Sequence, residues 1–191
     1  MADFEPNVSH FDLRPYGNLA ISIVADSHGQ IDPRILEVIA ESDVAIHAGD
    51  ILGVSVLESM RPRSGMVIAV RGNNDSQTTW PGSQNEKLKQ IPDVATLSCP
   101  GGMIVVEHGH SIDRIEQNHY PLAYKHSQAR AVVYGHTHLQ RLDQDSLPWL
   151  VNPGAAGITR NNGGASCYLL RIKAHQWTME SYKFTPFRKA G

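Results

Sequence analysis

The sequence predicts an α/β fold with a mixed sheet in a single domain. In the first third of the chain, short apolar runs rich in branched residues alternate with helix-like segments, which is typical of a parallel sheet covered by helices. The rest of the chain adds mainly strand-like runs. A length of 191 residues with 41% hydrophobic residues is sufficient for one folded core.

The first third is expected to read strand, helix, strand, helix, strand. Leu19–Ala25 is an apolar run typical of a buried strand. Asp32 and Pro33 resemble a helix start, a capping side chain followed by proline in the first turn. The other elements expected here are a strand at Val44–Ala48, a short helix at Val54–Met60 and a strand at Met66–Val70.

The polar stretch Asn73–Gln90 gives no clear structural signal. After it, Val94–Ser98 and Met103–Glu107 are expected to form a hairpin, because Pro100-Gly101-Gly102 joins them. The remaining expected elements are a helix around Pro121–Gln128 and strands at Ala131–Tyr134, Trp149–Val151, Ser166–Lys173 and Gln176–Phe184.

Composition and the N-terminal segment narrow the class of protein. The net charge of −2 gives no overall attraction to nucleic acid or an anionic membrane. Cys99 and Cys167 form no CxxC pair, which favours a reduced, cytoplasmic protein. Residues 1–18 carry acids and no apolar run, so we expect a loosely ordered or partner-docking extension, neither signal peptide nor membrane span. The single domain is expected at residues 19–186.

Polar motifs directly follow five of the expected strands. The carboxyl ends of strands in such sheets share one edge, so these motifs are expected to meet there. Side chains two residues apart on extended chain point the same way, which suits paired ligands. The motifs are Asp26-Ser27-His28-Gly29, Gly49-Asp50, Gly72-Asn73-Asn74-Asp75, His108-Gly109-His110 and Gly135-His136-Thr137-His138.

The donor types in these motifs indicate a metal site. Carboxylate and amide oxygens with imidazole nitrogens suit manganese, iron, zinc, nickel or cobalt. The motifs contain no thiolate, which argues against a structural zinc site. Two such metals about 3.5–4 Å apart can clamp the attacking and leaving oxygens of a phosphoryl displacement.

With these motifs the chain resembles the calcineurin-like metallophosphoesterases, above all their small bacterial and archaeal phosphodiesterase branch, to which a eukaryotic retromer subunit is related. The resemblance extends from about Ala20 to Tyr182. It implies a two-sheet β-sandwich flanked by helices, the αββα metallophosphoesterase fold. It also implies a phosphodiesterase that hydrolyses phosphate esters through a hydroxide activated by a dinuclear metal centre.

The resemblance gives each ligand a role. It implies two divalent metal ions, with manganese expected and nickel, cobalt, iron or zinc as alternatives. It places Asp26, His28 and His138 at the first metal, Asp50 as the bridge, and Asn73, His108 and His136 at the second metal.

Asn74 and His110 are the candidate catalytic residues. The wider superfamily has a histidine where this chain has Asn74, and that histidine is associated with the transition state or the leaving oxygen. Asparagine can donate a hydrogen bond but cannot deliver a proton. His110 has three open interpretations: contact with the phosphate, metal ligation, or support of a ligand.

Several residues near the motifs have both a functional and a structural interpretation. His47 lies inside a strand, where packing is preferred over ligation. The turn Asn152-Pro153-Gly154 either presents amides to a phosphate or is an ordinary turn. Arg71 could pair with a substrate charge, but a solvated arginine is preferred. Helix capping is the structural alternative for Asp26.

The leading function is therefore an enzyme that acts on a small phosphodiester or nucleotide-like substrate, with no membrane partner. The resemblance also leaves open a homo-oligomer, since relatives often form dimers or tetramers. The alternative function is a non-catalytic protein-binding scaffold with the same fold, which the retromer relative and Asn74 both suggest. The complete set of expected ligands favours the enzyme.

Overall fold

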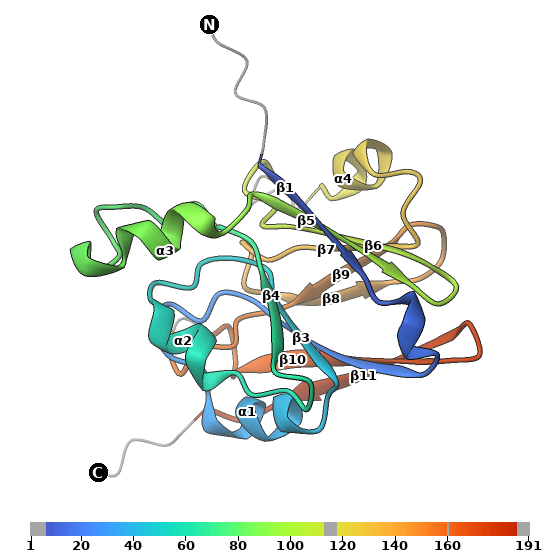
Figure 1. The fold of residues 1–191 in the computed structure, drawn as a ribbon, viewed down its shortest axis with the longest axis horizontal. Helices are drawn as coiled ribbons and strands as arrows, with labels where there is room; N and C mark the ends of the chain where they lie inside the picture. The colour runs from blue at the N-terminus through green and yellow to red at the C-terminus, as the bar shows by residue number, and fades with distance from the viewer. Residues whose placement is uncertain (1–6, 113–117, 160, 187–191) are drawn as a thin grey trace, which may run out of the picture.

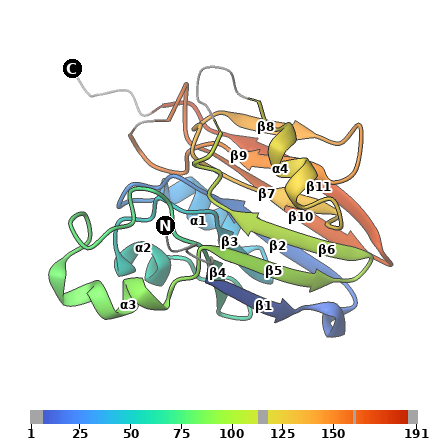
Figure 2. The same ribbon diagram turned by 90° about the horizontal axis from the view of Figure 1, so that it is seen from above.

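The computed structural model describes residues 7–112, 118–159 and 161–186. These residues form two β-sheets packed face to face, with helices on both outer faces (Figure 1). Figure 2 shows the same layers from above, with α4 over one sheet and α1 beneath the other. The predicted α/β class and the sandwich flanked by helices are both confirmed.

The five-stranded sheet has the spatial order β11-β10-β2-β3-β4. Its strands β2, β3 and β4 are parallel to one another, whereas β10 runs antiparallel to β2 and to β11. This part of the fold matches the expected strand-helix alternation. The bounds are β2 (Leu19–Val24), β3 (Val44–His47), β4 (Met66–Ala69), β10 (Ser166–Lys173) and β11 (Gln176–Lys183).

The six-stranded sheet has the order β1-β5-β6-β7-β9-β8. Strands β5 and β6 form the expected antiparallel hairpin, and β6, β7 and β9 are parallel. The bounds are β1 (Val8–Asp12), β5 (Val94–Cys99), β6 (Gly102–Glu107), β7 (Ala131–Val133), β8 (Gln140–Asp143) and β9 (Trp149–Pro153).

Local sequence explains where the first helix begins. Asp32 accepts a hydrogen bond from the Arg34 amide at 3.0 Å, and Pro33 stands in the first turn, as expected for a capped helix start. The α-helices are α1 (Pro33–Ala40), α2 (Val54–Ser59), α3 (Asn85–Gln90) and α4 (Tyr120–Lys125), and the 3-10 helices are η1 (Arg14–Tyr16) and η2 (Gly82–Gln84).

Strand β2 shows why the central strands are apolar throughout. Ile21 and Ile23 belong to the core between the sheets, whereas Ala20 and Val24 belong to the cluster that packs under α1 and α2. Each fully buried isoleucine stabilises the fold by roughly 1.5–3 kcal/mol. A strand buried on both faces therefore needs a continuous apolar run instead of alternation.

Two strands differ from expectation. Val8–Asp12 forms β1, which pairs in parallel with β5 at a sheet edge, so the prediction of a loosely ordered extension is wrong for these residues. Gln140–Asp143 forms β8, which was not predicted. Both are short edge strands with polar, partly exposed side chains, and such strands give a weak hydrophobic signal. The proposed domain limits stay a prediction.

Candidate metal centre

The topology brings the five motifs together, because β2, β3, β4, β6 and β7 all end at one edge of the sandwich. Backbone hydrogen bonds hold the first two motif loops side by side. The Asp26 amide donates to the Gly49 carbonyl at 3.0 Å, and the His28 amide donates to the Asp50 carbonyl at 3.0 Å. The site therefore forms where two neighbouring parallel strands end.

Most of the expected ligands have an unusual backbone conformation. Positive φ is rare for residues other than glycine and is concentrated at functional sites. It directs side chains of the tight loops toward a common centre. The expected ligands with left-handed backbone are Asp26 (φ 52°), His28 (φ 46°), Asp50 (φ 56°), His136 (φ 69°) and His138 (φ 59°).

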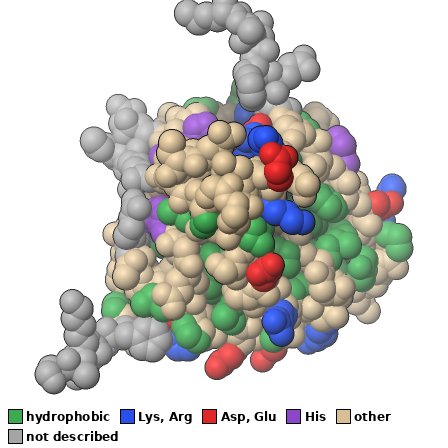
Figure 3. Space-filling model, turned by 60° about the vertical axis from the view of Figure 1, so that its left-hand side comes forward, with side chains coloured by type: hydrophobic (Ala, Val, Ile, Leu, Met, Phe, Trp, Pro, Cys, Tyr) green, Lys and Arg blue, Asp and Glu red, His purple; other side chains and the backbone are tan. Residues whose placement is uncertain are grey.

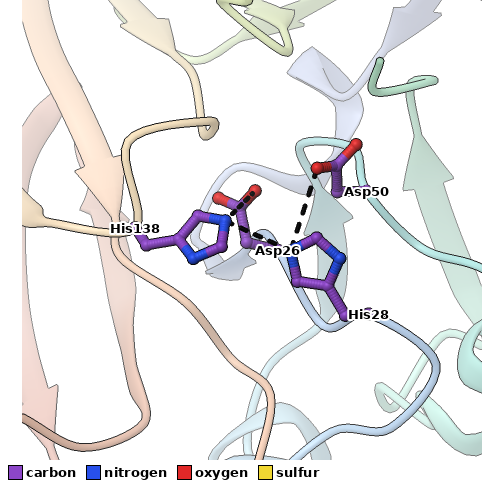
Figure 4. A group of neighbouring side chains, drawn as sticks. All are labelled: Asp26, His28, Asp50 and His138. Atoms are coloured by element: carbon purple, nitrogen blue, oxygen red, sulfur yellow. Dashed lines mark hydrogen bonds and ion pairs between the residues drawn. The ribbon is translucent and has the colours of Figure 1, made fainter. Parts of the chain in front are cut away.

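Asp26, His28, Asp50 and His138 form the first donor group, shown in Figure 4, and one ligand atom of each lies within 4.8 Å of the others. The two Nε2 atoms of His28 and His138 lie 3.1 Å apart. His138 Nε2 lies 3.3 Å from an Asp26 oxygen, and His28 Nε2 lies 3.8 Å from Asp50 Oδ2. Asp26, His28 and His138 are the residues expected at the first metal, and Asp50 is the expected bridge.

The second donor group lies on the other side of Asp50. Asp50 Oδ1 lies 3.4 Å from His108 Nε2. Asn73 Oδ1 lies 3.2 Å from His108 Nε2 and 2.9 Å from His136 Nδ1. The Asp50 carboxylate thus has one oxygen beside each group, which is the position that a bridging ligand needs.

The donors present fit divalent cations. Both carboxylate oxygens of Asp26 are buried, and neither has a hydrogen-bond partner among the described residues. A buried carboxylate in this state is costly unless a cation compensates it. Asp26 follows β2 and caps no described helix, so its capping alternative fails. Oxygen and imidazole donors at these distances suit the divalent transition metals.

The contact between His108 and Asp50 shifts the pKa of both side chains. Burial disfavours a charged His108, yet its hydrogen bond to Asp50 and the nearby Asp26 charge raise the pKa of the His108 imidazole. Burial also opposes ionisation of Asp50, but hydrogen bonds from His108 and Asn74 hold the pKa of that carboxyl below its ordinary value. A proton and a metal cation therefore compete for the His108 imidazole.

The two candidate catalytic residues lie in different places. Asn74 donates from its backbone amide to Asp50 Oδ1 at 2.8 Å and from Nδ2 to Asp50 Oδ2 at 2.6 Å. It therefore holds the carboxylate between the two donor groups. His110 is exposed, and its ring centroid lies 6.4 Å from that of His108. Their catalytic roles stay predictions.

Asp75 is a structural residue of the site to which the sequence pattern gave no separate role. Its buried carboxylate connects the loop that carries Asp50 with the loop that carries Asn73. The one feature of the sequence that pointed to Asp75 was its position at the end of the third motif. The groups that donate to it are the amides of Ile51 (2.9 Å), Leu52 (2.9 Å) and Gly72 (2.8 Å) and the indole of Trp80 (2.8 Å).

Asn152 supports the last motif from behind. Its Nδ2 donates to the Gly135 carbonyl at 2.8 Å and to Thr137 Oγ1 at 3.0 Å. Its Oδ1 accepts from the Gly154 amide at 2.9 Å. The Gly154 amide is thus used inside this turn, which favours the ordinary-turn alternative over phosphate binding.

The structure agrees with the preferred interpretation of His47 but not with that of Arg71. His47 is fully buried and shares a hydrogen bond of 2.9 Å with Ser27 Oγ. Burial lowers its pKa to about 3, so the ring is neutral, as the preferred packing role requires. Arg71 is not simply solvated, because its Nη2 pairs with Asp93 Oδ1 at 2.7 Å.

Charged side chains of both signs are mixed on the face of the molecule that Figure 3 shows. On the face in Figure 3, lysine and arginine side chains lie among acidic ones, and no extended patch of one sign is visible. None of the described helices is both long and apolar enough to cross a bilayer.

Comparisons with known proteins identify the family of the chain. The family model "Calcineurin-like phosphoesterase superfamily domain" matches residues 19–175. Phosphodiesterase MJ0936 of Methanocaldococcus jannaschii is 27% identical over 145 residues, 71% of this chain and 83% of that protein.

Solved structures share the fold. A structure from Streptococcus pneumoniae, described as a predicted phosphoesterase, matches with a TM-score of 0.60 and 21% identity, and the match covers 90% of this chain and 94% of that one. Wild-type Vps29 of Entamoeba histolytica complexed with zinc matches with a TM-score of 0.64 and 17% identity, covering 86% of this chain and 92% of the other.

Proposed function

The chain belongs to the calcineurin-like phosphoesterase superfamily, and from that premise we propose that it is a phosphodiesterase with a centre for two divalent cations. Its curated relatives are named phosphodiesterases or metallophosphoesterases. Metal-dependent phosphoester hydrolysis is the activity that family and donor cluster support together. The number of cations and the diester substrate are our proposal.

One observation carries the proposal of two cations: the Asp50 carboxylate lies between two donor groups, with Oδ2 toward His28 and Oδ1 toward His108. The first cation would be held by Asp26, His28 and His138. The second would be held by Asn73, His108 and His136, with Asp50 shared. When bound, such cations supply Lewis acidity toward the phosphate and lower the pKa of water.

Asn74 limits the chemistry that the chain itself can add. Its side chain holds Asp50 in place through the 2.6 Å hydrogen bond. An amide cannot pass a proton to a departing oxygen, whereas the histidine of the wider superfamily could. We therefore expect the enzyme to act best on diesters whose leaving group needs little protonation. His110, whose ring centroid lies 6.4 Å from that of His108, is the other side chain that we propose for a catalytic role.

Metal identity and location are proposed from the donors and the cysteines. We take manganese as the working metal, with nickel, cobalt, iron and zinc as alternatives that the same donors accept.

Cys99 and Cys167 are both buried free thiols, and burial raises the pKa of each to about 12. Unreactive thiols of this kind suit a reducing compartment, and we propose the cytoplasm.

The alternative is a protein-binding scaffold. The solved structures of Vps29 share the fold of this chain at 12–17% identity. This likeness supports a common fold and carries no information about activity. A scaffold has no need for a complete set of donors. Here all seven expected positions hold competent donors, and they converge, so we prefer the enzyme.

Hydrolysis of bis(p-nitrophenyl) phosphate by purified protein tests the proposal. We expect activity that disappears after chelation and returns with manganese, with two metals bound per chain. Asp50→Asn serves as the inactive control, and metal content is measured in the same samples. Full activity in verified metal-free protein would exclude the metal mechanism. Tight binding of two metals with no turnover would favour the scaffold.

A further inference from the structure

A cleft of about 390 Å³ opens beside the second donor group. His108, Gly109 and His110, which form the fourth motif, line one part of it. Arg71, which directly precedes the third motif, lines another. Because two ligand-bearing segments continue into its walls, a substituent of a phosphate bound at the donors is within reach of this cleft.

Two ion pairs line the cleft and balance its charge. Arg71 Nη2 lies 2.7 Å from Asp93 Oδ1, and Lys125 Nζ lies 2.6 Å from Glu107 Oε2. Glu107 is further held by His126 at 2.8 Å. An additional anion would meet two carboxylates, and an additional cation would meet a guanidinium and an ammonium. The cleft therefore favours a neutral group.

The same side chains retain hydrogen-bonding capacity. A guanidinium has five N–H donors and an ammonium has three. The Arg71 Nε–H is buried and has no partner in the part of the chain that the structure describes. Hydroxyl groups can accept from Arg71 or Lys125 and donate to Asp93 or Glu107 in the same arrangement. Two adjacent hydroxyls can divide these roles, with one accepting from Arg71 and the other donating to Asp93.

We propose that this cleft binds the sugar of a phosphodiester, a neutral group with free hydroxyls such as ribose, while the phosphate lies at the metal donors. This inference rests on the proposed phosphodiesterase function. The volume is within the range of small-molecule sites. An apolar substituent would accept no hydrogen bond from the remaining N–H groups of Arg71 and Lys125.

A series of p-nitrophenyl diesters with one leaving group and different retained groups tests the proposal. We compare kcat/KM of the manganese-loaded protein for the ribonucleoside 5′-phosphate ester and the ethyl phosphate ester. Hydrogen bonds to charged groups predict a preference of about 10–100-fold for the sugar ester. A glucose 6-phosphate ester distinguishes ribose from other sugars, and a preference for either sugar over ethyl supports the proposal.

Two variants locate the preference in the cleft. Arg71→Met should reduce the sugar preference to within about 3-fold while the ethyl ester is still hydrolysed. Asp93→Asn, which keeps the size of the side chain, should act in the same direction if Arg71→Met folds poorly. The matched control is Arg63→Met. Arg63 also pairs with an aspartate, Asp43, at 3.2 Å, but Asp43 lies at the start of β3, whereas the metal donors follow its end. That variant should keep the preference.

Failure of the inference and failure of the proposed function give different results. Turnover of bis(p-nitrophenyl) phosphate without a sugar preference overturns the sugar site and leaves the function. If no ester is hydrolysed, calorimetry with a ribonucleoside 5′-monophosphate and with ethyl phosphate still tests the cleft. Equal affinities for the two monoesters, unchanged by Arg71→Met, overturn the proposal, and tighter binding of the nucleotide supports it.

Discussion

Asn74 holds Asp50 by two hydrogen bonds, from its backbone amide to Oδ1 at 2.8 Å and from its side chain to Oδ2 at 2.6 Å. Residue 74 therefore lies beside the carboxylate that the two donor groups share. If Asp50 bridges two cations as proposed, a side chain at this position lies near the phosphate that they bind. We therefore expect that changing residue 74 alters the chemistry at the leaving group.

Asn74→His should improve hydrolysis of diesters with poor leaving groups more than of those with good ones. Histidine can protonate a basic leaving oxygen, and general acid catalysis contributes about 10²–10⁴-fold, which is an upper limit here. The measurement is the ratio of kcat/KM values for an alkyl and a nitrophenyl leaving group within each variant. Asn74→Gln, which adds no acid, is the control. An unchanged ratio with intact metal content would assign Asn74 only to holding Asp50.

Asp50→Asn should weaken both metal sites together, because its two carboxylate oxygens face different donor groups. His28→Ala should weaken mainly the first site, where its Nε2 lies beside His138. Native mass spectrometry counts the manganese ions bound per chain in both variants. Loss of a single ion in each variant would show that Asp50 does not bridge.

Asp75→Asn should lower both stability and metal affinity. An amide presents a donor where four N–H groups now meet a carboxylate, and the expected loss is roughly 2–4 kcal/mol in the free energy of unfolding. Thermal unfolding gives the stability, and calorimetry with manganese gives the affinity. Trp80→Phe removes one of these donors and leaves the loop amides, so it should keep the affinity. Equal affinity in all three proteins would limit Asp75 to a structural role.

Manganese affinity should fall as the pH is lowered. The pKa of His108 is raised in the metal-free protein, so its ring takes up a proton at a higher pH than an ordinary histidine does. That proton must leave before Nε2 can bind a metal, and the affinity is lost as pH falls through the raised pKa. His47, with a pKa of about 3, stays neutral over this range.

Calorimetric titration with manganese from about pH 8 to about pH 5 checks this dependence. His108→Gln retains a hydrogen-bonding side chain but no titrating ring, so its remaining affinity should change less steeply with pH. A wild-type affinity that is constant across this range would contradict histidine ligation.

The sequence by itself determined the order of the central elements and indicated the candidate donors. Strand β2 was readable because burial on both faces requires an unbroken apolar run, and α1 because Asp32 and Pro33 mark its start. The motifs could be recognised because each closely follows a strand. Edge strand β1 could not be predicted, since its exposed residues alternate with only partly buried ones, and the segment becomes a strand by pairing with β5.

The tertiary structure alone decided how the donors are shared and supported. No local pattern indicates that Asp50 presents one oxygen to each donor group, or that the amides of the Asp50 loop converge on Asp75, because these contacts join residues that lie far apart in the sequence. The pairing of Arg71 with Asp93 in the wall of the cleft is of the same kind. Residue types are local information, whereas distances between loops follow from the register of two packed sheets.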